Sequence, residues 1–126
     1  MLHYQRATVS FSVDDLAKAK TFYSETLGLD VAEMDGMLQL NLADNYLVWV
    51  YSKSDHRPAA YTVLNFTVED LGKAMSELMA SGVTFEHYDL PGAKTDEKGV
   101  VDYGMMKIAF FNDPAGNNHA VLQMTQ

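Results

Sequence analysis

The sequence VSFSVDDLAKA occupies residues 9–19, and it recurs at residues 64–74 as LNFTVEDLGKA. Six of the eleven aligned positions are identical, where chance would give about one. Similarity at a fixed spacing indicates a duplicated structural unit. The chain is therefore predicted to contain two copies of one module.

Each copy begins with an alternating pattern that predicts a strand with one buried face. Phe11 and Val13 alternate with small polar residues, and the second copy repeats this pattern. Acidic pairs follow at residues 14–15 and 69–70, where a carboxylate accepts hydrogen bonds from the free N–H groups of a first helical turn. Apolar residues at helical spacing come next, and Gly28 and Gly82 are placed to end the two helices.

Three further strands are predicted after each helix. They cover residues 29–34, 37–42 and 46–51 in the first copy and residues 83–90, 104–111 and 119–124 in the second. The predicted fold class is α+β, with one domain over residues 1–126 that contains tandem βαβββ modules at about 5–52 and 60–125 and a linker at about 53–59. Since one helix covers only one face of a sheet, we expect the modules to form a curved mixed sheet around a cleft, within one chain or between two.

Composition excludes several classes of function. The formal net charge of −8 opposes binding to nucleic acid, and no segment approaches the roughly 20 apolar residues that span a bilayer. The chain has no cysteine, which removes disulfides, thiolate nucleophiles and zinc–thiolate sites. We expect a cytoplasmic protein that contacts neither membrane nor nucleic acid.

Two stretches carry a family resemblance. FSVDDLAKAKTFYSETLGLDV at residues 11–31 resembles the strand and helix that open a module of the vicinal oxygen chelate superfamily. FFNDPAGNNHAVLQ at residues 110–123 resembles the closing motif of that superfamily, which includes glyoxalase I, ring-cleaving dioxygenases, fosfomycin-resistance transferases and bleomycin-resistance proteins. The resemblance implies a pair of βαβββ modules but leaves the chemistry open, because one fold supports many functions.

In metal-dependent members, the resemblance implies four histidine or glutamate ligands on the first and last strands of the modules. Three of those positions here are Thr8, Val63 and Ala120, and the fourth falls at Leu47 or Val48. Glyoxalase and dioxygenase chemistry needs nitrogen or oxygen donors that converge on one cation. We therefore expect no metal and no other cofactor, as in bleomycin-resistance-like members that bind a small molecule.

The cleft should be lined by strand residues that point away from the helices. Small hydroxyls and amides there suit a polar ligand, the single tryptophan could stack on a planar ring, and Lys107 could anchor an anion. Water contacts or ordinary core packing are the alternatives for these side chains. The predicted ligand-binding residues are Thr8, Ser10, Gln39, Asn41, Trp49, Val63, Asn65, Met105, Lys107 and Ala120.

Two histidines and one segment lie outside the predicted set of ligand-binding residues. His119 should point to the face opposite Ala120, because side chains alternate along a strand. His87 lacks an identifiable carboxylate partner, so packing or surface exposure is favoured over acid–base work. The segment LPGAKTDEKGVVDYG at residues 90–104 is predicted as a lid or a surface loop, with Tyr103 and Met105 at its hinge.

These observations favour metal-independent binding or sequestration of a small organic molecule by a homodimer. One alternative is a glyoxalase-like lyase, isomerase or dioxygenase with metal ligands outside the usual positions. Another is a structural dimer with a vestigial cleft. The sequence leaves open whether the protein is an enzyme.

Overall fold

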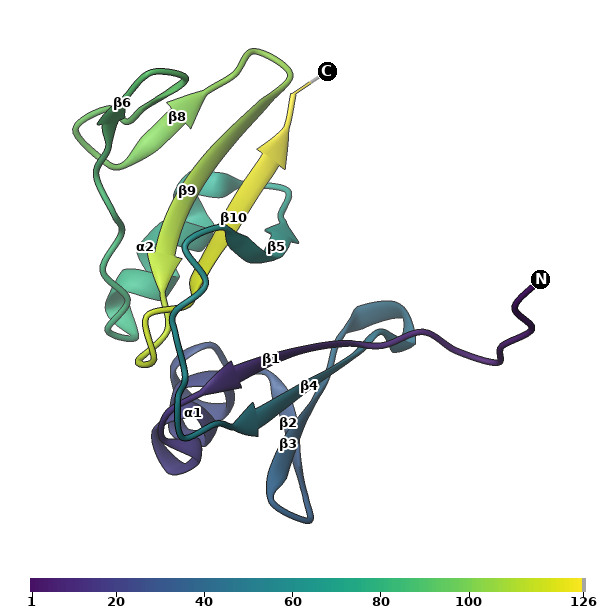
Figure 1. The fold of residues 1–126 in the computed structure, drawn as a ribbon. Helices are drawn as coiled ribbons and strands as arrows, with labels where there is room; N and C mark the ends of the chain where they lie inside the picture. Colours follow the sequence, from purple (N-terminus) through teal and green to yellow (C-terminus); the bar gives the residue numbers. More distant parts are fainter. Residues whose placement is uncertain (126) are drawn as a thin grey trace. The chain divides into compact units, whose positions relative to one another are not determined.

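The computed structural model describes residues 1–125, and the chain divides into two compact units, Met1–Arg57 and Pro58–Gln126. Each unit has its own four-stranded mixed sheet with a helix packed on one face (Figure 1). The first sheet has the strand order β1-β4-β3-β2, and the second has the equivalent order β5-β10-β9-β8. The predicted α+β class with two βαβββ modules is confirmed.

Unit 1 contains β1 (Val9–Val13), α1 (Leu16–Thr21), β2 (Asp30–Met34), β3 (Met37–Asn41) and β4 (Leu47–Ser52). β1 lies parallel to β4, and the other neighbouring strands are antiparallel. A single 3₁₀ turn, η2 (Ala43–Asn45), connects β3 to β4.

One face of the first sheet packs against α1. Phe11 lies 5.9 Å from Tyr23 between ring centroids, and Lys20 of α1 forms an ion pair of 3.0 Å with Glu33 of β2. Burying apolar side chains of this size contributes about 1.5–3 kcal/mol each. The buried residues on this face are Phe11, Val13, Leu38, Leu40, Val48 and Val50.

The first helix changes its hydrogen-bonding pattern after Thr21. Residues Phe22–Thr26 form a π-helical turn, η1, in which the amide of Leu27 donates to the carbonyl of Phe22. Phe22 and Tyr23 then meet edge to face at 5.1 Å, and Tyr23 is fully buried. The predicted single helix therefore has an α-helical half and a π-helical half.

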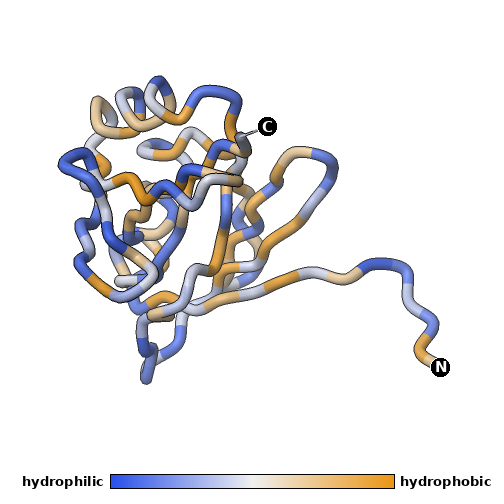
Figure 2. The backbone as a smooth tube through the Cα atoms, turned by 90° about the horizontal axis from the view of Figure 1, so that it is seen from above, coloured by the Kyte–Doolittle hydropathy of each residue, from blue (hydrophilic) through white to orange (hydrophobic). Residues whose placement is uncertain are grey.

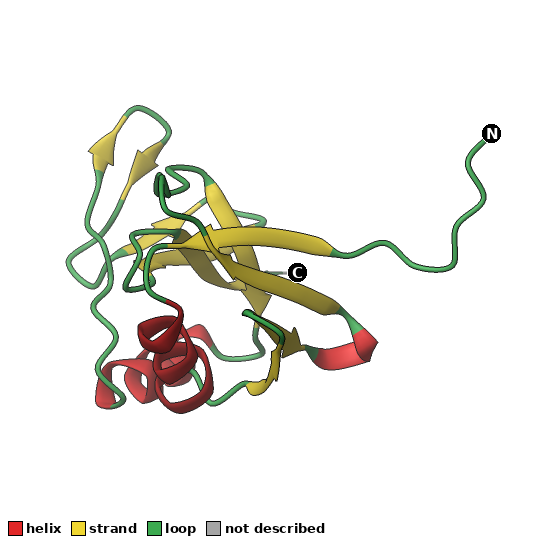
Figure 3. Ribbon diagram, turned by 60° about the horizontal axis from the view of Figure 1, so that its bottom comes forward, coloured by secondary structure: helices red, strands yellow, loops and turns green. Residues whose placement is uncertain are grey.

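Unit 2 contains four strands in its main sheet and one ten-residue helix. The elements are β5 (Thr62–Thr67), α2 (Leu71–Ala80), β8 (Val100–Asp102), β9 (Met106–Asn112) and β10 (Asn118–Met124). A separate hairpin pairs β6 (Asp89–Leu90) with β7 (Ala93–Lys94). In each unit the helix lies against one face of the main sheet (Figure 3).

The predicted strand at residues 83–90 is wrong for most of its length. Val83 and Phe85 are buried as the alternation indicates, but Phe85 makes only an isolated bridge to Phe111. β8 occupies the sheet position beside β9 instead. Residues 90–104, predicted as a lid or loop, form the β6–β7 hairpin and β8, and the hydroxyl of Tyr103 donates to the carbonyl of Gly92 at 2.7 Å.

The predicted helix ends are confirmed. The carboxylate of Asp15 accepts from the amide of Lys18 at 3.1 Å, and that of Asp70 accepts from the amide of Lys73 at 3.0 Å. Gly28 and Gly82 have φ angles of 71° and 105°, which side-chain-bearing residues rarely adopt. The repeated sequence therefore supplies the N-cap of each helix, and a glycine beyond the repeat ends each helix.

Residues 1–8 precede β1 as an extended segment without regular structure (Figure 2). Met1, Leu2 and Tyr4 in this segment are largely exposed. Among the described residues, no helix has the length and apolar character needed to cross a bilayer.

Candidate functional site

The face of the first sheet that points away from α1 carries most of the predicted polar residues. Ser10 and Gln39 are both in register with Trp49, so the three lie in one row across β1, β4 and β3. Asn41, in register with Leu47, lies in the adjacent row. We call this surface the polar face; its residues are Ser10, Ser12, Asp30, Ala32, Met34, Met37, Gln39, Asn41, Leu47, Trp49 and Tyr51.

A chain of hydrogen bonds links three polar-face residues. The indole Nε1 of Trp49 donates to Oε1 of Gln39 at 3.1 Å. Nε2 of Gln39 then donates to Oδ1 of Asn41 at 2.9 Å. All three side chains are partly buried, and the two hydrogen bonds hold them in fixed positions next to solvent. The structure thus brings together Gln39, Asn41 and Trp49, which were predicted as ligand-binding residues.

The predicted residues of β1 lie beside this chain. Ser10 is exposed on the polar face, and Thr8 is half-buried just before β1 begins. The neighbouring Ser12 hydroxyl is 2.7 Å from Nδ1 of His56. No sequence pattern predicted this contact, because His56 follows β4 in a segment that was expected to be a linker.

In unit 2, Asn65 and Ala120 are in register on the face of the sheet that points away from α2. An irregularity in the pairing of β5 with β10 falls between Asn118 and Ala120. Val63 lies opposite this irregular stretch and is half-buried. A compact apolar cluster covers the same face, made of Val101, Ile108, Ala120 and Leu122 with Met106 and Phe110 packed against it.

Two predicted residues of unit 2 lie elsewhere. Lys107 is in register with Gln123, whose Oε1 accepts from the amide of Leu71 at the start of α2. Lys107 is therefore exposed on the helix face of the sheet, opposite the face that carries Ala120. Met105 lies in the turn before β9 and is 63% exposed.

Tyr88 is a candidate that the sequence did not single out. Its ring lies 5.5 Å from that of Phe110, and its hydroxyl accepts from Nδ2 of Asn118 at 3.2 Å. Burial raises the pKa of the Tyr88 phenol, and the nearby Glu86 carboxylate raises it further, while the Asn118 bond acts in the opposite direction. Tyr88 thus places a neutral phenol over the apolar cluster of unit 2.

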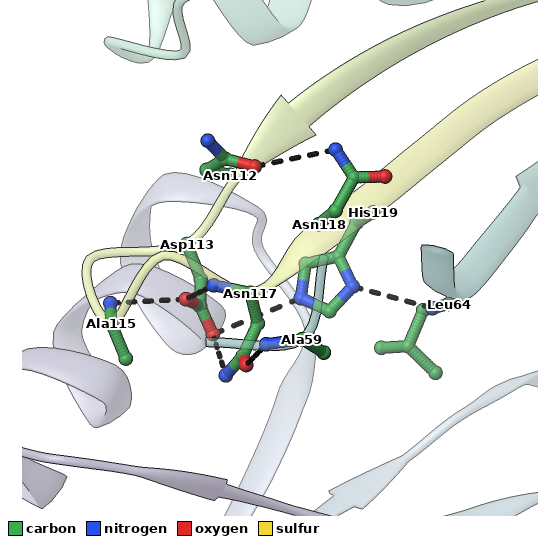
Figure 4. Close-up of polar contacts among 8 residues, drawn as sticks. All are labelled: Ala59, Leu64, Asn112, Asp113, Ala115, Asn117, Asn118 and His119. Carbon is green, nitrogen blue, oxygen red and sulfur yellow. Dashed lines mark hydrogen bonds and ion pairs between the residues drawn. The ribbon is translucent and has the colours of Figure 1, made fainter. Parts of the chain in front are cut away.

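The closing motif forms a buried polar network (Figure 4). Oδ1 of Asp113 accepts from the amides of Ala115 and Asn117 at 3.0 and 2.8 Å, and Oδ2 accepts from Nδ2 of Asn117 at 3.1 Å. Oδ1 of Asn117 accepts from the amide of Ala59 at 3.0 Å, which ties the loop to the segment before β5. The motif therefore has a structural role in unit 2.

His119 belongs to this network. It is in register with Phe111 and lies on the face opposite Ala120, as predicted. Nδ1 accepts from the amide of Leu64 at 3.3 Å, so in the neutral ring the proton is on Nε2, which lies 3.8 Å from Oδ2 of Asp113. The side chain is fully buried. His87, in contrast, is exposed in the segment between α2 and β6.

The donor set does not match a metal centre of the kind that the resemblance implies. Within residues 1–125, no group of three or more histidine, aspartate or glutamate side chains is placed to hold a metal ion. The positions expected to carry ligands hold Thr8, Val63 and Ala120, and Leu47 or Val48 at the fourth. None of these side chains is an imidazole or a carboxylate.

A groove of about 610 Å³ lies on the helix side of unit 2. Its walls come from α2, including Met75 and Met79, and from segments 83–87 and 97–98. None of the ten predicted ligand-binding residues lines it.

Comparisons with known proteins agree with this architecture. A family model described as Glyoxalase/Bleomycin resistance protein/Dioxygenase superfamily matches residues 3–121. Among curated proteins, no sequence matches significantly.

Several solved structures share the fold. TnmS3, an antibiotic binding protein from Streptomyces sp. CB03234, has a TM-score of 0.68 and 24% identity, with coverage of 98% of this chain and 100% of that chain. The fosfomycin resistance protein FosX from Listeria monocytogenes has a TM-score of 0.70 and 12% identity, covering 98% and 96%. A glyoxalase/bleomycin resistance protein/dioxygenase from Alicyclobacillus acidocaldarius has a TM-score of 0.70 and 17% identity, covering 97% and 92%.

Proposed function

The chain belongs to the glyoxalase/bleomycin resistance protein/dioxygenase superfamily, and we propose that it binds a small organic molecule on the polar face of unit 1 without a metal ion. The observation that carries the proposal is the hydrogen-bonded chain of Trp49, Gln39 and Asn41. Ligand sites combine apolar walls with a few fixed polar groups. The polar face has this composition, because Ala32, Met37 and Leu47 flank the three linked residues.

The residues at the family's ligand positions support metal independence. Threonine, valine and alanine side chains there offer no imidazole or carboxylate to a divalent cation. Two structural neighbours are described as an antibiotic binding protein and a fosfomycin resistance protein. The hydroxyl, amide and indole groups of the polar face can bind a small molecule through hydrogen bonds and ring contacts without a metal ion. These groups therefore support binding or sequestration as the function.

Trp49 gives a direct test, because it is the only tryptophan in the chain. We expect a binding molecule from a panel of planar aromatic compounds to change Trp49 fluorescence in a saturable way, with and without EDTA. At a hundred times its Kd, such a ligand stabilises the folded state by about 2.7 kcal/mol, which raises the Tm by about 10 °C. Glu77→Ala, which changes an exposed side chain of α2 in unit 2, should bind as the wild type does.

Two results would contradict the proposal. One is the absence of any saturable change across the panel, which would favour a structural protein. The other is binding that EDTA abolishes and a divalent metal restores, which would favour a metal-dependent enzyme.

We also propose that the chain forms a homodimer. Large apolar side chains are exposed in both units, including Val9, Met34 and Tyr51 in unit 1 and Met124 in unit 2. Exposed apolar surface of this kind favours association. Light scattering should give twice the chain mass of 14.0 kDa. A single-chain mass at every protein concentration tested would exclude the dimer.

A further inference from the structure

The chain of side-chain hydrogen bonds on the polar face has a fixed direction. The indole of Trp49 can only donate, so the side-chain atom of Gln39 that faces it must be the oxygen. Nε2 of Gln39 consequently points toward Asn41, and the atom of Asn41 that receives it must also be an oxygen. Neither amide can be turned over without placing two donors against each other.

This direction places the side-chain amide nitrogen of Asn41 at the end of the series of hydrogen bonds. Asn41 Nδ2 has two N–H groups, and within the described part of the chain it has no acceptor. The side chain is only partly buried, so a ligand can reach it. The polar face therefore offers a positioned hydrogen-bond donor close to the ring of Trp49.

The surrounding charge restricts which acceptor would bind there. Asp30 is in register with Asn41, and Asp44 follows in the next turn. The chain also carries a formal net charge of −8. These negative charges oppose a carboxylate, sulfonate or phosphate beside Asn41, whereas a neutral carbonyl oxygen meets no such repulsion.

We propose that the ligand of the polar face is a planar aromatic molecule with a neutral carbonyl oxygen. Its ring stacks on Trp49, and its carbonyl accepts from Nδ2 of Asn41. The hydrogen bonds from Trp49 to Gln39 and from Gln39 to Asn41 orient the Asn41 side-chain amide. Its N–H groups therefore favour a ligand that has a hydrogen-bond acceptor at this position over one that has a donor. This inference rests on the proposed function, because it names the ligand class for the same surface.

Three probes that share one tricyclic ring system test the ligand class: 9-fluorenone, which has a neutral carbonyl, fluorene, which has none, and fluorene-9-carboxylate, which is anionic. The single indole N–H resonance of the ¹⁵N-labelled protein reports binding at Trp49. We expect 9-fluorenone to bind about tenfold more tightly than either other probe, which corresponds to about 1.4 kcal/mol.

Asn41→Asp removes the terminal donor but keeps an oxygen that can accept from Gln39. This variant should lose the tenfold preference for 9-fluorenone over fluorene, while the added negative charge should keep fluorene-9-carboxylate weakly bound. The indole resonance of the free protein should stay near its wild-type position. Asn45→Asp is the matched control, because it makes the same charge change in the exposed turn after β3 and should keep the preference.

The outcomes separate the two proposals. If all three probes bind the wild type with affinities within twofold of one another, the inferred ligand class is wrong and the proposed function stands. If Asn41→Asp keeps the preference for 9-fluorenone over fluorene, Asn41 is not the selecting donor. If none of the probes shifts the indole resonance at saturating concentration, the ligand class is wrong, and the fluorescence panel then decides the proposed function separately.

Discussion

Replacing Asp113 with alanine should lower the free energy of unfolding by about 3–5 kcal/mol. The buried carboxylate accepts from two backbone amides and from the side-chain amide of Asn117. Alanine leaves these donors without their acceptor, and each unpaired buried donor costs about 1–3 kcal/mol. The expected loss exceeds that for most single substitutions because one side chain holds the whole loop.

Urea unfolding followed by far-UV circular dichroism measures the Asp113→Ala effect. Asp113→Asn should lose less, because its carbonyl oxygen can still accept from the backbone. Asp96→Ala is the exposed comparison, since Asp96 accepts from the amides of Lys98 and Val100 at the surface, and it should lose about 1 kcal/mol. A loss from Asp113→Ala no larger than that from Asp96→Ala would show that the network contributes little.

Replacing Tyr23 with alanine should destabilise unit 1 by about 3–5 kcal/mol. Its ring is fully buried and contacts Phe11 and Phe22 edge to face, so truncation leaves a cavity that the sheet and the π-helical turn cannot fill. Trp49 lies in the same unit, so its fluorescence during urea unfolding reports this loss.

Tyr46→Ala is the matched control for Tyr23→Ala. Tyr46 is 69% exposed, and its truncation should change the free energy of unfolding by less than about 0.5 kcal/mol. Equal effects of the two substitutions would mean that the core of unit 1 does not depend on the Tyr23 ring.

Local signals in the sequence were sufficient to predict the modules. Alternation identified the buried Phe11 and Val13, and the acidic residues before each helix became N-caps at Asp15 and Asp70. These features depend on neighbours within a few residues, which the sequence displays directly.

The prediction of a strand at residues 83–90 was wrong because it depended on strand pairing rather than on local sequence. Alternation correctly placed Val83 and Phe85 inside, but burial does not specify which backbone pairs with which. The three-residue β8 occupies the position beside β9 in the sheet, and it is too short to show an alternating pattern in the sequence. Alternation of apolar and polar residues therefore could not predict which strands pair over long sequence distances.

The candidate site was predictable only in part. Side-chain alternation placed Gln39 and Asn41 on one face, and the register of β3 with β4 brought Trp49 beside them. The direction of their hydrogen bonds depends on atomic positions, and Tyr88 reaches Phe110 from a segment without regular pairing. Lys107 was assigned to the ligand face although its register with Gln123 puts it on the helix face.

The π-helical turn after α1 explains how the two halves of the chain diverged. Gly28 follows Asp15 by thirteen residues, whereas Gly82 follows Asp70 by twelve. The first half has thus gained one residue, or the second has lost one, inside the helix, and the wider turn at Phe22–Thr26 absorbs the difference. A difference of one residue would otherwise shift the following strand by one position and turn its side chains to the opposite face. The π-helical turn accommodates this difference within the helix, so the strand keeps its buried face.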